Sequence, residues 1–233
     1  MSPRPGNRLL AGLPREEFER LRPELLTVNI RPREVVHHAG DAIDYVYFPN
    51  SGVFSLTSPL PDGALVEALT VGDEGMVGLE ALFASDAVAG SQNLVQVPDA
   101  SAERLGITAF RRELERHGAL HAAVARYAQV GIAVIMLGAA CNARHGVQQR
   151  CAKWLLMTHD RVHRHREFRL SHEFLAITLG TTRPTVTLVA SALQRAGMIA
   201  YKHGRVSVLD RRALERAACA CYPLIRTQFA RLA

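Results

Sequence analysis

The chain has 233 residues, of which 48% are hydrophobic and 21% are charged, and its net charge is +6. This composition is ordinary for globular proteins and argues against both a disordered chain and a membrane protein. The length allows two modest domains, each with a core of its own. Residues 1–22 carry several charges and no apolar leader, so we expect a cytoplasmic protein.

The two parts of the chain carry opposite net charges. Residues 1–143 hold 12 Lys and Arg against 17 Asp and Glu, a balance of −5, whereas residues 144–233 hold 16 against 5, a balance of +11. A basic C-terminal part joined to an acidic remainder is typical of a nucleic-acid-binding module attached to another domain. A solvated basic face would give the same numbers, so the charge by itself leaves both interpretations open.

The first half of the chain predicts an all-β domain that follows a short helix around Arg15–Leu21. Between residues 26 and 109, short alternating runs are separated by Gly, Pro, Asn and Asp. Residues 52–57 and 64–71 predict a hairpin, because Asp62-Gly63 between them supplies the positive φ angles of a tight turn. The glycine-rich residues 71–78 predict an exposed or ligand-facing loop.

From Ile107 onward the apolar periodicity is helical. The longest apolar run, Val130–Cys141, is shorter than the roughly 20 residues of a membrane-spanning helix, so we expect a buried helix and no membrane contact. An alternating spacing of three and four predicts a helix that packs on a second copy. The residues of this predicted dimerisation seam are Leu120, Val124, Tyr127, Gly131, Val134 and Gly138. The core helix of a monomer has the same pattern, so that alternative stays open.

Residues 171–195 predict two short helices joined by a glycine turn. Ser171 is a good N-cap for the first helix, and Gly180 ends it. Thr182 caps the second helix, and Pro184 lies in the first turn, where proline is tolerated. Two helices of this kind form a helix-turn-helix, which places its second helix in the DNA major groove.

A two-stranded wing is predicted after Gly197, with Lys202-His203-Gly204 at its tip. Basic side chains there suit phosphate oxygens, whereas Arg183 on the second helix is suited to donate two parallel hydrogen bonds to a guanine. The full set of predicted DNA contacts is Ser171, His172, Thr182, Arg183, Thr185, Thr187, Lys202, His203 and Arg205.

These motifs resemble the Crp/Fnr superfamily of bacterial regulators, most closely over residues 170–199. The resemblance implies an α+β chain with a cyclic-nucleotide-binding-like β-roll of the double-stranded β-helix or jelly-roll type, a long dimerisation helix and a winged helix-turn-helix. The implied domains are residues 1–116, 117–143 and 144–233. By position, Arg183 matches the family's guanine-reading arginine, and Thr182 and Thr185 match its phosphate-contacting hydroxyls. Pro184 stands where the catabolite activator protein has a base-reading glutamate, so a different target sequence is expected.

The resemblance weakens at the loop that would bind a cyclic nucleotide. Gly75, Met76, Val77 and Gly78 lie at the matching positions, and no Arg or Lys occurs between Arg33 and Arg104. A phosphate there would lack a countercharge, so we do not expect cAMP binding. An iron–sulfur cluster of the Fnr type is not expected either, because the first 140 residues contain no cysteine. We therefore expect no cofactor, and the sequence does not identify an effector.

Smaller groups of polar residues favour neither metal binding nor catalysis. His159, His163 and His165 are interleaved with arginines, which favours a basic connector over a metal site. Cys219 and Cys221 are interpreted as small buried hydrophobes, with a redox role as the alternative. The four cysteines show no CxxC spacing, so no metal is expected. No nucleophile elbow, phosphate loop or metal-ligand triad occurs, so we expect no enzyme activity.

The sequence therefore predicts a homodimeric, sequence-specific transcription regulator on a pseudo-palindromic operator. Its expected partners are double-stranded DNA, a second copy of itself and, as a further candidate, RNA polymerase. One alternative is a small-molecule sensor in which the β-roll is the working part. Another is a hydrolase or lyase that uses the β domain. A third is a constitutive DNA-binding protein that is regulated only by its abundance.

Overall fold

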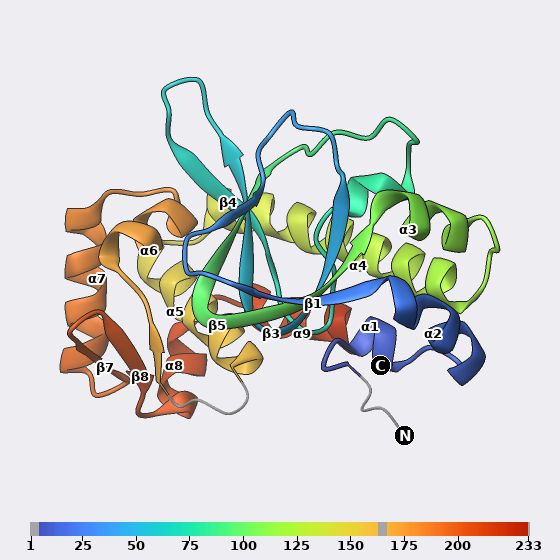
Figure 1. Cartoon of the computed structure of the whole chain (residues 1–233). Coiled ribbons are helices and arrows are strands. Elements are labelled where there is room, and N and C mark those ends of the chain that lie inside the picture. The colour runs from blue at the N-terminus through green and yellow to red at the C-terminus, as the bar shows by residue number, and fades with distance from the viewer. Residues whose placement is uncertain (1–4, 163–166, 233) are drawn as a thin grey trace.

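The computed structural model describes residues 5–162 and 167–232, apart from the side chains of residues 97–99, and has an α+β fold (Figure 1). A β-roll occupies the centre, with the N-terminal helices on one side and the helix-turn-helix on the other. The N-terminal part contains α1 (Arg8–Ala11), α2 (Arg15–Leu21), η1 (Arg22–Glu24), β1 (Leu25–Ile30), β2 (Val35–His37), β3 (Tyr45–Pro59), β4 (Leu65–Val71), η2 (Leu79–Leu82) and β5 (Gln92–Gly106). The predicted helix over Arg15–Leu21 is confirmed.

The β-roll is one antiparallel sheet with the strand order β1-β5-β3-β4, and β2 pairs with β5. The pairing of β3 with β5 shifts register at three places between Pro49 and Phe54, and such irregularities bend and twist strands. The predicted hairpin is confirmed, because β3 and β4 pair up to Pro59 opposite Leu65 and Gly63 has a φ of +82°.

The helical part begins at α3 (Ile107–Leu114), where the sequence predicts it. The long helix α4 (Ala119–Arg144) follows and packs against β4 and α1. Its N-terminus is capped from outside, since the Glu17 carboxylate on α2 accepts hydrogen bonds from the backbone N–H groups of Ala119 (3.0 Å) and Leu120 (2.6 Å). A carboxylate at this end also complements the helix dipole.

The predicted dimerisation seam faces the chain's own interior. Five of its residues, Leu120, Val124, Tyr127, Gly131 and Val134, are buried, and Gly138 is half-buried. These residues therefore form intrachain packing, which corrects the predicted contact with a second helix. A heptad spacing shows that one face of a helix is apolar, but it does not show which surface covers that face. The apolar residues that α4 exposes lie elsewhere: Ile132, Ile135 and Met136, which are 54%, 42% and 68% exposed.

By length and composition α4 could cross a membrane, since its 26 residues contain a window of mean hydropathy 1.6. In the structure 39% of that window is buried against the rest of the chain. The core helix of a globular protein has the same properties, so this observation is weak support for a membrane span.

The C-terminal part contains α5 (Val147–Arg161), β6 (Glu167–Arg169), α6 (His172–Leu179), α7 (Arg183–Arg195), β7 (Ile199–Lys202), β8 (Arg205–Val208), α8 (Arg211–Ala217) and α9 (Cys221–Ala230). The three strands form a small sheet in the order β6-β8-β7. The helix α8 packs on α5, while α9 returns to contact α4 (Figure 1).

Two buried polar contacts join α5 to the β-roll. The Glu67 carboxylate on β4 accepts a hydrogen bond from Trp154 Nε1 at 2.8 Å and another from the Ser55 hydroxyl. Burial raises the pKa of Glu67 to about 7. Arg161 at the end of α5 forms an ion pair with Glu74 at 2.7 Å, and both side chains are almost fully buried. Buried polar groups are costly unless paired, so these contacts define how α5 sits on the roll.

Candidate nucleic-acid interface

The turn between α6 and α7 has the geometry that the sequence predicts. The Ser171 hydroxyl accepts a hydrogen bond from the N–H of Phe174 at 3.1 Å, and Gly180 follows α6 with a φ of +55°. The Thr182 hydroxyl accepts a long hydrogen bond, 3.5 Å, from the N–H of Thr185, and Pro184 lies in the first turn of α7. Two N-caps and a left-handed glycine thus fix both helix boundaries.

One face of α7 is buried and the other is open. Val186, Ala190 and Leu193 pack inward, whereas Arg183 and Thr187 lie on the exposed side. The predicted base-reading arginine is therefore accessible from outside the chain.

Leu188 is 72% exposed on the same helix, and this residue is not among the predicted contacts. It lies four positions after the exposed Pro184, so the two form an apolar edge on the open side of α7. The exposure of Leu188 could have been predicted from the sequence, because this residue lies outside the apolar stripe of Val186, Ala190 and Leu193. An apolar side chain at this place suits a thymine methyl group.

His172 connects three elements of the domain. Its Nδ1 lies 2.9 Å from the Thr187 hydroxyl on α7, and its ring lies 4.5 Å from that of Tyr201 on β7. Because Thr187 donates its own proton to the carbonyl of Arg183, Nδ1 is the donor in this pair. Burial, and then the nearby Arg183 charge, lower the pKa of His172. The Thr187 hydroxyl is thereby engaged within the chain, and its methyl group is the part left for DNA.

The wing ends in a two-residue turn. His203 and Gly204 have φ angles of +51° and +72°, as a hairpin turn of the primed kind requires. Lys202, His203 and Arg205 are exposed around it. Arg205 Nη1 pairs with Glu167 on β6 at 2.6 Å, so part of its charge is already neutralised. Lys202 is the better candidate for a phosphate contact.

The β-roll touches the helix-turn-helix directly. The helix α6 packs on β4, and the Arg33 guanidinium donates a hydrogen bond of 3.3 Å to the Ser171 hydroxyl. The Ser171 oxygen therefore serves as N-cap and as acceptor from the roll, which makes it a positioning residue as well as a predicted DNA contact.

The loop of residues 72–78 differs from its predicted role. Met76 and Val77 are fully buried, and the Val77 backbone exchanges two hydrogen bonds with Tyr47, at 3.0 and 2.8 Å. A Cβ atom added at Gly75 would lie 2.4 Å from the Tyr127 ring of α4, and Gly78 has a φ of +88°. The prediction that this loop is exposed is therefore wrong, because α4 covers it, while its ligand-facing role stays a prediction.

The remaining polar groups named from the sequence fall in different places. His159 accepts a hydrogen bond from Arg211 at 2.9 Å, and burial followed by the Arg211 charge lowers its pKa. His163 and His165 lie outside the described residues.

Cys219 and Cys221 are buried, as predicted, and they lie beside Cys141 and His145. Burial raises the pKa of the Cys221 thiol to about 12.

A curled β-roll, a long helix and an accessible helix-turn-helix with a wing together define a transcription-regulator fold. Residues 149–217 match the Crp-like helix-turn-helix domain family. The solved structures most useful for comparison include TTHB099, a CRP-family transcriptional regulator from Thermus thermophilus. It is 26% identical over 82% of this chain and 96% of its own, with a TM-score of 0.68.

Two further structures share the fold at lower identity. FixK2 from Bradyrhizobium japonicum is 17% identical over 84% of this chain and 98% of its own, with a TM-score of 0.71. A putative regulator of the Crp/Fnr family from Eubacterium rectale is 15% identical over 91% and 98%, with a TM-score of 0.70. No curated protein sequence matches significantly. The chain thus carries a Crp-like helix-turn-helix domain over residues 149–217, and it shares its fold with transcription regulators of the Crp/Fnr superfamily.

Proposed function

We propose that the chain is a sequence-specific DNA-binding protein that acts as a homodimer on a pseudo-palindromic operator. The observation that carries this proposal is the exposed N-terminal turn of α7, where Thr182 and Arg183 project from a capped helix start beside a basic wing. The net charge of +11 over residues 144–233 supplies the attraction to phosphates.

Arg183 is the proposed base-reading residue. A guanidinium can donate two parallel hydrogen bonds to guanine O6 and N7, which contributes about 1–3 kcal/mol of discrimination. Thr182, Thr185 and the backbone N–H of Arg183 are the proposed phosphate contacts, since a helix N-terminus attracts anions. Pro184 and Leu188 offer apolar contact in place of a second polar base reader.

The exposed stripe of α4 supports the dimer. Ile132, Ile135, Met136 and Ala139 follow one another at spacings of three, one and three, which gives one continuous exposed face. Pairing of this face with a second copy would bury the apolar side chains that the single chain exposes. A two-fold axis along α4 would present two α7 helices to half-sites about one helical turn apart.

The proposed regulator does not respond to cAMP. Met76 and Val77 fill the place of the nucleotide-binding loop, and no Arg or Lys between Arg33 and Arg104 can balance a phosphate. The same burial argues against the alternative in which this loop makes the β-roll the working part. The proposed location is the cytoplasm, with DNA and RNA polymerase as partners.

Selection of bound sequences from random DNA tests the proposal. We expect an enriched pseudo-palindrome, bound at least about 1,000-fold more tightly than random DNA at the same salt concentration. A folded protein that enriches no sequence would contradict it. For the dimer, Met136→Glu should give monomers in analytical ultracentrifugation, whereas Ser85→Glu, at an exposed polar position outside α4, should leave the dimer intact.

A further inference from the structure

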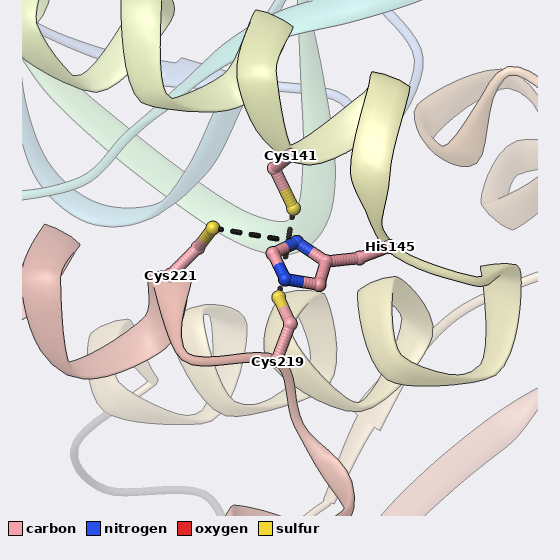
Figure 2. A group of neighbouring side chains, drawn as sticks. All are labelled: Cys141, His145, Cys219 and Cys221. Carbon is pink, nitrogen blue, oxygen red and sulfur yellow. Dashed lines mark hydrogen bonds between the residues drawn. The ribbon is translucent and has the colours of Figure 1, made fainter.

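Three cysteines and one histidine meet where the end of α4 lies against the start of α9. Figure 2 shows the sulfur atoms of Cys141, Cys219 and Cys221 gathered around the imidazole ring of His145. One ligand atom from each of these residues lies within 4.8 Å of all the others. We propose that this tetrad binds one zinc ion per chain. The proposal does not depend on DNA binding.

The spacing of the ligand atoms fits a single tetrahedral ion. Cys141 Sγ lies 3.5 Å from Cys219 Sγ, and Cys221 Sγ lies 3.6 Å from His145 Nδ1. With Zn–S bonds near 2.3 Å and Zn–N bonds near 2.0 Å, a tetrahedron has edges of about 3.8 Å between sulfurs and about 3.5 Å between sulfur and nitrogen. Small side-chain adjustments are enough to complete the site.

Local structure brings the ligands together in two pairs. Cys141 and His145 are four residues apart at the last turn of α4, so they lie on one face, and the N–H of His145 donates to the carbonyl of Cys141 at 2.9 Å. Cys219 follows the end of α8, and Cys221 begins α9, with a tight turn closed by the N–H of Tyr222 to the carbonyl of Cys219 at 3.1 Å. Each pair comes from a rigid helix end.

The donor set selects zinc by its chemistry. Thiolate and imidazole are the ligands of structural zinc sites, and three Cys with one His is a common closed set. All four ligands come from the protein, so no open position is left for a substrate. A two- or four-iron cluster has its ligands on different iron atoms and needs a wider separation than 4.8 Å.

Burial and charge agree with an occupied site. Cys141, Cys219 and Cys221 are 0%, 2% and 7% exposed, so thiolates formed at this depth would need a cation. Three thiolates and one Zn²⁺ leave a charge of −1, which the Lys153 ammonium offsets from 3.4 Å away at Cys141 Sγ. Partners of this kind around the ligands tune metal affinity.

The ion would connect the long helix to the DNA-binding domain. Cys141 lies in the last turn of α4 and His145 directly follows that helix, while Cys219 lies between α8 and α9 and Cys221 begins α9. The same segment holds α5, because Asp160 on α5 accepts hydrogen bonds from Arg211 at 2.6 Å and from the Tyr222 hydroxyl at 2.9 Å. Zinc at this place would fix the angle between α4 and the domain that carries α7.

The test uses the full chain, purified under reducing conditions without chelator. We expect about one zinc per chain by elemental analysis. After zinc removal, titration with Co²⁺ should give the thiolate-to-cobalt charge-transfer bands and intense visible bands of a tetrahedral site. Cys219→Ser and His145→Ala should lower zinc affinity by more than about 100-fold, and Lys153→Met by about 10-fold. Cys151→Ala, the fourth cysteine of the sequence, is the matched control and should keep the metal.

Several outcomes would overturn the proposal. The cobalt titration of the unaltered chain tests the metal site even if a variant fails to fold. Absence of thiolate–cobalt bands there refutes the site, as does equal metal loss in Cys151→Ala. An iron–sulfur chromophore after anaerobic purification, or a Cys141–Cys219 disulfide that excludes zinc, would assign the cluster to other chemistry.

Discussion

The helix α7 and the loop of residues 72–78 are the segments in which the sequence predicts DNA contacts and ligand contacts, yet they have opposite surroundings. The helix keeps its polar residues at the surface, with Arg183 and Thr182 exposed. The loop is covered by α4 and holds Met76 and Val77 at zero exposure. The polar residues of α7 are accessible to a partner, whereas Met76 and Val77 of the loop are part of the core. Mutations in and around the loop should therefore change stability, whereas those on α7 should change DNA binding.

The largest effect is expected at the ion pair that holds the loop to α5. Arg161→Met leaves the Glu74 carboxylate buried without a countercharge and should lower the free energy of unfolding by about 3–5 kcal/mol. Urea denaturation measures this change. Arg205→Met is the matched control, because its pair with Glu167 is solvent-exposed and contributes little. Equal losses in the two variants would mean that the Arg161 pair is not a buried contact.

A second test uses the raised pKa of Glu67. Its pKa rises from 4.5 to about 7 because it is buried, although Arg161 and Lys153 act in the opposite direction. The folded state therefore holds a proton that the unfolded state releases, and this stabilisation is lost as pH rises from about 4.5 to about 7. The loss should total about 3 kcal/mol, and Glu67→Gln should remove it from the pH profile of unfolding. Parallel profiles for both proteins would show that folding does not raise the pKa of Glu67.

Gly75→Ala tests whether the loop is packed or free to bind a ligand. The added Cβ would lie 2.4 Å from the Tyr127 ring, which is itself buried, so we expect a loss of about 1–3 kcal/mol in thermal or urea unfolding. Gly106→Ala has no atom within 4 Å of the added Cβ and serves as the control. An open ligand loop would instead tolerate both substitutions equally.

On the α7 side, Arg183→Ala should leave stability unchanged and weaken operator binding by about 1–3 kcal/mol, roughly 5- to 150-fold. Affinity for random DNA should change much less. Fluorescence anisotropy with both DNAs at one salt concentration measures the difference. Arg195→Ala, at the far end of the helix, is the control for a general loss of positive charge. An equal loss of affinity for operator and random DNA would show that Arg183 does not read a base.

The smallest effect is expected at the wing. Lys202→Ala should weaken binding to operator and random DNA alike and reduce the slope of log affinity against log salt by about 1. Arg126→Ala removes the same charge from an exposed position on α4 and should leave the slope unchanged. An unaltered slope in Lys202→Ala would count against a phosphate contact.

Local signals in the sequence were enough to predict the helix-turn-helix. Ser171, Gly180 and Thr182 each act through the backbone within a few residues, so their roles do not depend on distant parts of the chain. The hairpin turn at Gly63 is local in the same sense. Helix caps and tight turns can therefore be predicted from the sequence alone.

Packing between distant segments could not be predicted in this way. The loop is buried by Tyr127, about fifty residues further on, and the covered face of α4 depends on where the roll lies. Cys141 and Cys219 meet across 78 residues, which no short spacing reveals. Each pattern is compatible with several neighbours, and only the tertiary fold selects one.

The exposed stripe of α4 links the chain's stability to its abundance. Ile132 and Met136 stay in contact with water in the single chain, and pairing as proposed would remove them from it. If only folded chains dimerise, mass action raises the melting temperature as the protein concentration rises. The cellular concentration of the protein would then regulate its activity, because it sets both the fraction of chains that are folded and the fraction that can bind two DNA half-sites as dimers.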